Sequence, residues 1–400
     1  MRNQCTRWTA VVIAWTCLAR SALAQSEPAA DATPAEFGAQ ARAIYRVVAC
    51  AGNDALLPNI DAATVAAYCD GLQAAIEKYR ANYTVKAESY IAALRPDGLP
   101  TTVIYPFGGG DLISALTTYP DATEVTTISL ELSGDPRRIA EVDRKQLAAS
   151  LRQLRGGLAG LLMWNDSKSV TLSKQQRGEL PGELSYFMVG LALHGYEPVG
   201  LRYFTIRLDG TLHYLTNEEI TTADHATAKQ LKKNWTPPDF SPAFANAELT
   251  FKKVGAGPDA PLRVHRHVAW NLDNDHLPKD APLLKHLALK GPVSTMTKAA
   301  SYLLWRDAFS NIRDYLLANM VFMISDSTGI PGQYVQPAGF IQDTYGTFEG
   351  SFLGASRTHN DAFRKLWKSN PHRDLPFRYG YLDSSRQFHL LITRRPSAAP

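Results

Sequence analysis

The chain contains little cysteine, little excess charge and, beyond its first residues, no long apolar run. Only 4 of its 400 residues are cysteine, and the formal net charge is +4. No segment after residue 24 has the roughly 18 uninterrupted apolar residues of a membrane helix, so we expect no membrane span. Arg2, Arg7 and Arg20 carry three of the positive charges, which leaves the rest of the chain near +1. A chain so close to neutral is not typical of nucleic-acid binders, and we expect no nucleic-acid partner.

The N-terminus has the pattern of a secretory signal peptide. A basic start is followed by an apolar run, Trp8–Ala19, that is too short to anchor the chain in a bilayer. Ala22-Leu23-Ala24 then supplies the small-x-small pattern of a cleavage site. We therefore predict a signal peptide over residues 1–24 and an exported protein, periplasmic or secreted, of 376 residues. Residues 25–33 are small and polar, which predicts a flexible leader.

A helical N-terminal region is predicted over residues 34–99. Apolar residues at helical spacing mark a first helix over Pro34–Cys50. Asp61 can cap a second helix, and a third is predicted from about Tyr83 to Leu94.

Cys50 and Cys69 are the two cysteines that remain after cleavage of the signal peptide. An even count in an exported chain predicts a disulfide, here between the first and second helices. Two unpaired buried thiols are the alternative. Without a companion histidine the pair makes a poor zinc site.

An α/β region is predicted over residues 100–395, and the stretch Thr101–Glu131 is its nucleus. It reads as a strand, a glycine turn, a short helix and a second strand that ends on an acid. Further helices are predicted at about Ile139–Leu161, interrupted near Gly156-Gly157, and at Gly182–His194. Leu201–Leu215 has the pattern of a hairpin around Asp209-Gly210.

Residues 216–292 are polar and proline-rich in part, and we predict an irregular insertion there. Within it, Glu248–Val254 and Arg263–Asn271 have strand character. The expected elements after the insertion are a helix at Ser301–Ala318, a strand at Met320–Asp326, strand-like segments at Phe340–Phe352 and Pro376–Thr393, and a helix at Asp361–Lys368. Alternating strands and helices predict an α/β, three-layer Rossmann-like core with a mixed, mainly parallel sheet and antiparallel C-terminal strands.

The glycine turn is the first candidate for a ligand site. In dinucleotide-type sites, glycines let the backbone approach a ligand, and the next helix offers unpaired N–H groups to an anion. An acid after the second strand accepts hydrogen bonds from a ribose diol, and Glu131 lies 23 residues after Gly108. The candidate ligand-binding residues are Tyr105, Phe107, Gly108, Gly109, Gly110, Asp111, Glu131 and Asp326. These residues predict a small-molecule ligand without identifying a cofactor.

The strand–turn–helix–strand unit resembles that of class I S-adenosylmethionine methyltransferases. The alternating elements, the acid after the Met320–Asp326 strand and the late antiparallel strands resemble that fold too. The turn departs from the family pattern, because Ile113 stands where a third glycine falls and Asp111 follows the glycines. The chain also resembles a group of exported bacterial proteins through three motifs. These are Tyr105-Pro106-Phe107 with Gly108 and Asp111, Glu197-Pro198-Val199, and the run from Asp326 to Pro331.

Other candidates are weaker. His265 and His267 alternate on one predicted strand, so they share a face that either binds a metal or is solvated. Asp326 either faces a ligand or forms a turn with the hydroxyl residues that follow it. Three functions stay open. The first is binding of a small polar ligand or partner, the second is an enzyme, either a transferase that uses the glycine turn or a hydrolase that uses Asp326 and a histidine, and the third is a structural envelope protein.

Overall fold

The computed structural model describes residues 33–52, 57–164, 180–230, 241–352 and 355–396, the side chains of 160–164 and 226–230 excepted. Ala35–Pro400 form one compact unit, and residues 1–34 are assigned to a second. No helix among the described residues is long and apolar enough to cross a membrane.

A ten-stranded mixed sheet organises the unit, in the order β4-β3-β5-β6-β2-β1-β7-β8-β10-β9. The strands are β1 (Thr102–Pro106), β2 (Glu124–Ser129), β3 (Tyr196–Ile206), β4 (Leu212–Tyr214), β5 (Ala247–Lys253), β6 (Arg263–Ala269), β7 (Val293–Thr297), β8 (Met320–Ser325), β9 (Ile341–Gly346) and β10 (His389–Arg394). The central strands β6, β2, β1, β7 and β8 are parallel to one another. Antiparallel strands flank both edges of this block. On one side they are β10 and β9, as the sequence predicted, and on the other they are β5, β3 and β4, of which the sequence predicted the β3–β4 hairpin.

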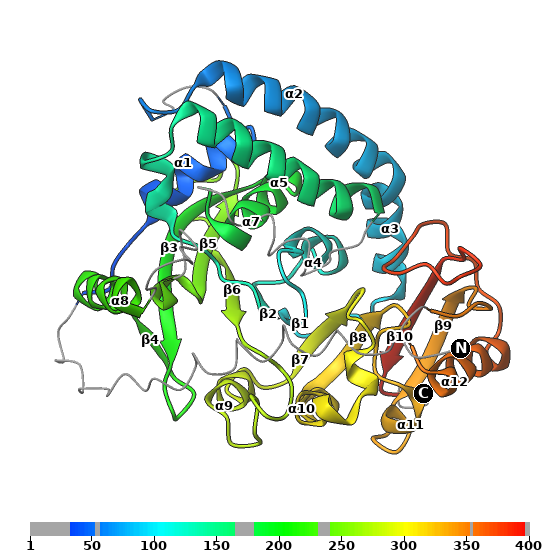
Figure 1. Cartoon of the computed structure of the whole chain (residues 1–400). Coiled ribbons are helices and arrows are strands. Elements are labelled where there is room, and N and C mark those ends of the chain that lie inside the picture. The colour runs from blue at the N-terminus through cyan, green and yellow to red at the C-terminus, as the bar shows by residue number, and fades with distance from the viewer. Residues whose placement is uncertain (1–32, 53–56, 165–179, 231–240, 353–354, 397–400) are drawn as a thin grey trace, which may run out of the picture. The chain divides into compact units, whose positions relative to one another are not determined.

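Helices cover both faces of the sheet, as predicted for an α/β protein (Figure 1). One face carries α1 (Gly38–Val48), α2 (Ala62–Tyr79), α3 (Val85–Leu94), α4 (Leu112–Thr118), α5 (Arg144–Trp164) and α7 (Gly182–Leu193). The other carries α9 (Pro282–Ala288), α10 (Ser310–Asn319) and α11 (Gly332–Val335). The remaining helices are α8 (Asn217–Gln230) and α12 (Arg357–Ser369).

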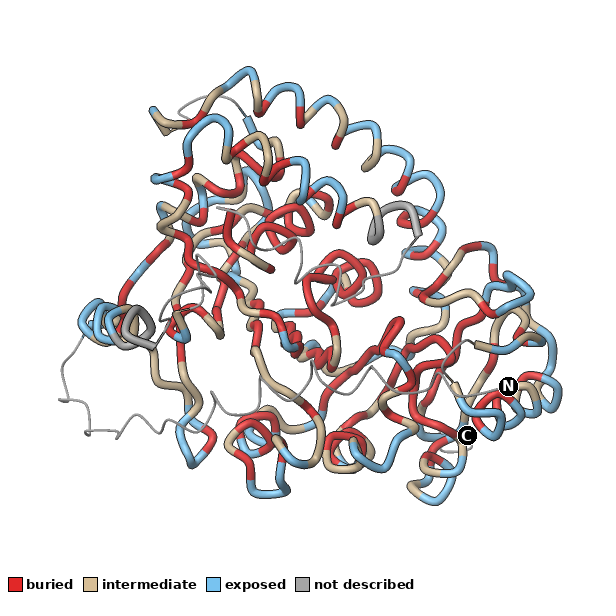
Figure 2. Tube along the Cα trace, viewed as in Figure 1, coloured by how far each residue is buried: buried red, intermediate tan, exposed pale blue. Residues whose placement is uncertain are grey.

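Most of the hydrophobic core forms two clusters with the sheet between them, and a third, smaller cluster contains Phe348, Phe363, Trp367 and Leu391. Along β1, Val103 and Tyr105 join the cluster under α1–α7, while Ile104 joins the cluster over α9–α11. This alternation follows from the twofold side-chain period of a strand. Figure 2 shows buried residues along the strands and the inward faces of the helices, with exposed residues along the outside of α2.

The helical N-terminal region is present and carries the predicted disulfide. Asp61 accepts a hydrogen bond from the Thr64 amide and so caps α2 as expected. Cys50, which follows α1, is bonded to Cys69 of α2, with a Cα–Cα distance of 5.6 Å. Apolar residues of α1–α3 belong to the same cluster as residues of β1 and β2, so these helices share the core of the sheet.

Four sequence expectations need correction. The segment predicted as an irregular insertion contributes β5 and β6 to the sheet, because their alternating residues bury one side. β7 was not predicted, since its sequence VSTMT is largely polar, yet all five residues are buried. The helix expected over Ser301–Ala318 begins at Ser310, after two short 3₁₀ turns, and α5 continues through Gly156-Gly157 without a break.

Candidate functional site

The glycine turn lies at the carboxyl end of β1, where the parallel strands β1 and β7 run side by side. Chain connections leave in opposite directions from this point, which is where open α/β sheets place ligands. Residues 108–111 are all buried. A Cβ on Gly108 would lie 2.8 Å from the Tyr105 ring, and one on Gly110 would overlap the Glu183 carboxylate. The glycines are therefore required by close contacts with the protein's own side chains.

A buried ion pair that sequence reasoning missed joins the turn to the end of β7. Lys298 Nζ lies 2.6 Å from Asp111 Oδ2 and 2.6 Å from Ser114 Oγ. The Tyr105 hydroxyl donates to the same Asp111 oxygen at 3.1 Å, and burial is the main cause that raises the pKa of this phenol. Asp111 and Lys298 have essentially no exposed side-chain surface. The sequence did not indicate this contact, because Lys298 follows the polar strand β7, which was not predicted.

The Asp111 carboxylate also occupies the N-terminus of α4. Its Oδ1 accepts a hydrogen bond from the Ser114 amide at 3.1 Å, so the helix is capped by its own side chain. The Ser114 amide is therefore not free to bind an anion, which weakens the expectation that this helix offers N–H groups to a ligand. A phosphate at this position would meet a carboxylate in place of a positive helix end.

Glu131 lies two residues beyond β2, and its side chain is buried with 5% of its surface exposed. Neither carboxylate oxygen has a hydrogen-bond partner among the residues that the structure describes. Leu130, immediately before it, is 63% exposed. Glu183, in the first turn of α7, contributes a second buried carboxylate at Gly110.

A chain of hydrogen bonds runs from His265 to the backbone of Glu131. His267 Nε2 is 2.8 Å from the Glu131 carbonyl, which can only accept, so Nε2 carries the proton. Nδ1 of His267 then accepts from Thr127 Oγ1 at 3.0 Å, and Thr127 in turn accepts from His265 Nε2 at 2.9 Å. This chain fixes the tautomers of both rings when they are neutral.

The two histidines therefore do not form the solvated strand face that we expected. Both are buried beside Phe187, whose ring centroid is 4.3 Å from that of His265. Burial lowers the pKa of both imidazoles, which keeps them neutral near pH 7. Among the described residues no group of three or more His, Cys, Asp or Glu side chains is arranged to hold a metal ion.

Asp326, just after β8, is engaged by protein donors on both oxygens. Oδ1 accepts from the amide and the hydroxyl of Thr328, which confirms the turn interpretation. Oδ2 accepts from the amides of Ala299 and Tyr381, at 3.0 Å each. A Cβ on Gly380 would overlap this oxygen. Asp326 thus connects the turn after β8 with the segments that contain Ala299 and Tyr381. Because protein donors engage both carboxylate oxygens, neither oxygen is left for a ligand.

Ser327 and His389 form a second buried pair at the end of β8. Ser327 Oγ lies 3.1 Å from His389 Nε2, and both side chains are fully buried. His389 Nδ1 points to the Gln387 carbonyl at 3.4 Å, which leaves Nε2 to accept the serine proton. The partners are 62 residues apart in the sequence, so no local motif could have identified them.

Backbone strain is concentrated at the carboxyl ends of β1 and β7. Phe107, Ala299, Ser301 and Tyr302 have φ values of 62°, 56°, 52° and 60°. Each non-glycine residue in this left-handed region costs on the order of 1 kcal/mol. Such residues collect at ligand-binding and catalytic sites more often than elsewhere.

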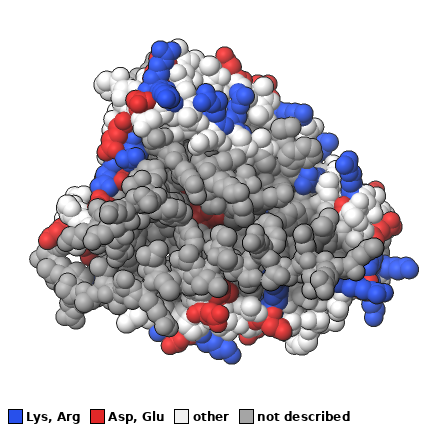
Figure 3. Space-filling view, viewed as in Figure 1, with Lys and Arg blue, Asp and Glu red and all other residues white. Residues whose placement is uncertain are grey.

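Of the predicted site residues, the structure brings Tyr105, the glycines and Asp111 together with Lys298, and Glu131 lies at the next strand end. Asp326 reaches this edge through the loop after β7. In Figure 3, basic and acidic side chains are interspersed among the described residues of the face it displays. Comparison with known proteins found no matching family model, no matching curated protein and no matching solved structure.

Proposed function

We propose that this chain is an exported protein that binds a small ligand through a vicinal diol at Glu131. The observation that carries the proposal is the buried Glu131 carboxylate, which lacks a donor on either oxygen within the described chain. Burying a carboxylate without partners costs several kcal/mol, so a site of this kind gains most when a ligand supplies the donors. A diol brings two hydroxyl donors, one for each oxygen.

The charges around Glu131 favour a neutral or cationic ligand over a phosphate. Asp111, Glu131 and Glu183 are buried acids, and Lys298 is held by Asp111. In dinucleotide sites the N-terminus of this helix binds the pyrophosphate, but here the Asp111 side chain already caps α4. A nucleoside or a sugar therefore fits this edge better than a nucleotide does.

The strand order supports the resemblance to class I methyltransferases. The parallel strands β6-β2-β1-β7-β8, numbered by their order along the chain, follow the 3-2-1-4-5 arrangement of a Rossmann-type sheet. The late strand β10 is antiparallel to β8 and lies between β8 and β9, in keeping with the late antiparallel strands of that family. In the resemblance, Glu131 stands at the position of the acid that accepts the ribose hydroxyls.

A panel of small ligands tests the proposal on the mature, disulfide-bonded chain. Thermal unfolding is followed with adenosine, adenosine monophosphate, S-adenosylmethionine and free ribose. We expect at least one diol compound to raise the midpoint, with no gain from the phosphate. Glu131→Gln should weaken that binding by about tenfold or more, the loss of one hydrogen bond to a charged group.

The control is Glu218→Gln, which changes an exposed glutamate in the first turn of α8. It should leave binding unchanged. A panel in which no diol binds, or in which Glu131→Gln binds as well as the wild type, contradicts the proposal.

A hydrolase is the second candidate function, and the Ser327–His389 pair favours it. The pair has the hydrogen bond and the tautomer that let a histidine accept the proton of an attacking serine. A fluorophosphonate probe tests this directly, since attack by Ser327 Oγ forms a serine–phosphorus bond and releases fluoride. Labelling that disappears in Ser327→Ala supports the hydrolase, and the absence of labelling in the folded wild type removes it.

A further inference from the structure

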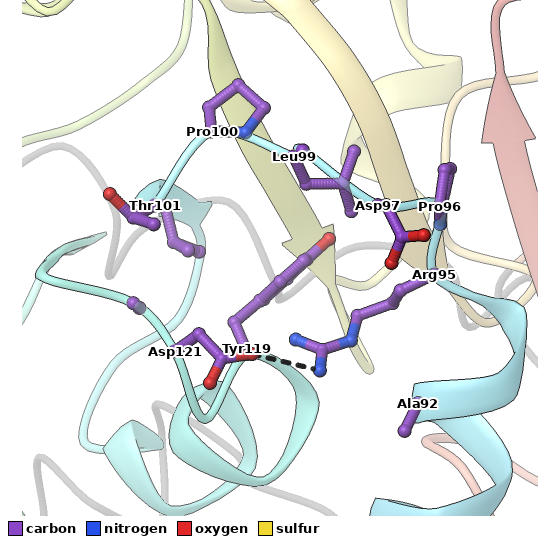
Figure 4. Close-up of a pocket in the computed structure, with 12 residues that line it drawn as sticks. Ala92, Arg95, Pro96, Asp97, Leu99, Pro100, Thr101, Tyr119 and Asp121 are labelled. Carbon is purple, nitrogen blue, oxygen red and sulfur yellow. Dashed lines mark hydrogen bonds and ion pairs between the residues drawn. The ribbon is translucent and has the colours of Figure 1, made fainter.

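A pocket lies at the opposite edge of the sheet, at the amino end of β1 (Figure 4). It has a volume of about 270 Å³, just below the usual range for ligand sites. Its walls come from the end of α3, the loop into β1 and the loop after α4. None of its lining residues belongs to the Glu131 site.

Apolar residues make up part of the pocket lining, and hydrogen bonds hold two of the lining residues in place. Its apolar lining consists of Ala92, Pro96, Leu99, Pro100, Val103, Tyr119 and Ala122. The Tyr119 hydroxyl is fixed by a 2.6 Å hydrogen bond to the Thr295 carbonyl, so the ring cannot swing away. The Pro100 carbonyl accepts from Ser294 Oγ at 2.8 Å, which ties the entering loop to β7. A preformed lining that combines these apolar residues with polar ones suits a compact ligand with an aliphatic and a polar part.

One basic and two acidic side chains complete the lining. Arg95 is largely buried, with 15% of its side chain exposed, and its guanidinium carbon lies 6.0 Å from the Tyr119 ring centroid. Its one ion pair in the described chain is a single 3.4 Å contact with Asp121, whose side chain is 79% exposed. A guanidinium has five N–H donors and binds carboxylates best through two of them. Most of its hydrogen-bonding capacity is therefore available to a ligand.

The charged side chains that line the pocket indicate which class of ligand it binds. Asp97 and Asp121 outnumber Arg95 in the lining, so the pocket disfavours a simple anion. A zwitterion can meet both signs of charge, because its carboxylate meets Arg95 while its ammonium meets one of the two aspartates. We propose that this pocket binds a free α-amino acid with an aliphatic side chain, whose apolar part fills the space between Leu99, Val103 and Tyr119.

Calorimetric titration of the mature, disulfide-bonded chain tests the assignment with three matched compounds. These are leucine, 4-methylpentanoate, which lacks the ammonium, and 3-methylbutylamine, which lacks the carboxylate. We expect leucine to bind at least about tenfold more tightly than either analogue, as expected if each ion pair contributes about 1.4 kcal/mol. No heat of binding for leucine, or equal affinity for 4-methylpentanoate, overturns the proposal.

Variants locate the site and separate it from the diol site. Arg95→Gln should reduce leucine affinity about tenfold or more, while Arg357→Gln, which changes a fully exposed arginine of α12, should not. If Arg95→Gln fails to fold, Asp97→Asn changes an exposed residue and should remove the preference for leucine over 4-methylpentanoate. Glu131→Gln should leave leucine binding intact. Leucine binding that survives both Arg95→Gln and Asp97→Asn contradicts the assignment to this pocket.

Discussion

At the scale of single residues, the buried pair of Asp111 and Lys298 is the strongest constraint on the glycine turn. Removing one partner leaves the other charge buried and unpaired, so we expect Lys298→Met to lower the free energy of unfolding by about 3–5 kcal/mol. Chemical denaturation measures this loss. The exposed control Lys365→Met should stay within about 0.5 kcal/mol of the wild type. The double variant Asp111→Leu/Lys298→Met should lose less than the sum of the two single variants, because it leaves no orphan charge. Strict additivity would show that the two side chains do not interact.

Glu131 should show the opposite behaviour in the absence of ligand. Its carboxylate is buried and unpartnered within the described chain, so Glu131→Gln removes a charge that destabilises the unliganded fold. We expect this variant to raise the free energy of unfolding by about 1 kcal/mol while it weakens diol binding. Equilibrium unfolding with and without ligand separates the two effects. A variant that is less stable than the wild type would assign Glu131 to a structural hydrogen bond.

At the scale of elements, the disulfide joins α1 to α2 across a separation of 19 residues. Closing a loop of this length stabilises a fold by roughly 3 kcal/mol in the chain-entropy model. We expect Cys50→Ser/Cys69→Ser to lose about that amount in chemical denaturation. Reductant should lower the midpoint of the wild type and leave the variant unaffected. If reductant changes neither protein, the bond contributes nothing to stability.

The elements that sequence reasoning identified are those with a clear apolar period. β1, β2 and β8 are apolar or β-branched and end at a turn or an acid, and the hairpin of β3 and β4 has its turn glycine at Gly210. β7 was missed because hydroxyl side chains fill a buried strand, where Thr295 Oγ1 bonds the Ile104 carbonyl at 2.8 Å. No local pattern reports such a partner on a neighbouring strand.

Local sequence patterns also did not report the contacts between distant segments that build the candidate site. Gly108–Gly110 and Glu131 carry a local signature and were identified, whereas Lys298 and His389 act through contacts with residues distant in the sequence. The sequence also could not show that Asp111 caps its own helix, which argues against a phosphate at the turn.

At the scale of the whole molecule, six histidines make stability depend on pH. Burial is the main cause that lowers the pKa of His194, His265, His267, His286, His359 and His389 in the folded chain, to about 4 for His194, His286 and His359. The unfolded chain binds these protons near pH 6.5 and the folded chain does not. Stability is therefore complete above pH 6.5 and falls as the pH drops toward 4.

Each proton taken up on unfolding adds about 1.4 kcal/mol per pH unit to this loss. The free energy of unfolding, measured by chemical denaturation, should fall by several kcal/mol in total between pH 7.5 and pH 5. His194→Gln should make this fall smaller. The carboxylates with lowered pKa values, such as Glu248, lose their contribution at lower pH, so they do not account for this window. A profile that stays level down to pH 5 would contradict the buried, neutral state of these rings.

The most direct test of the central claim, that Glu131 accepts a vicinal diol, is a two-by-two calorimetric titration. The diol compound that binds best and its dideoxy counterpart are each titrated into the wild type and into Glu131→Gln. We expect the wild type to prefer the diol by about tenfold or more, and the variant to bind both compounds with the same low affinity. A preference for the diol that is equally large in Glu131→Gln would place the diol elsewhere and contradict the account.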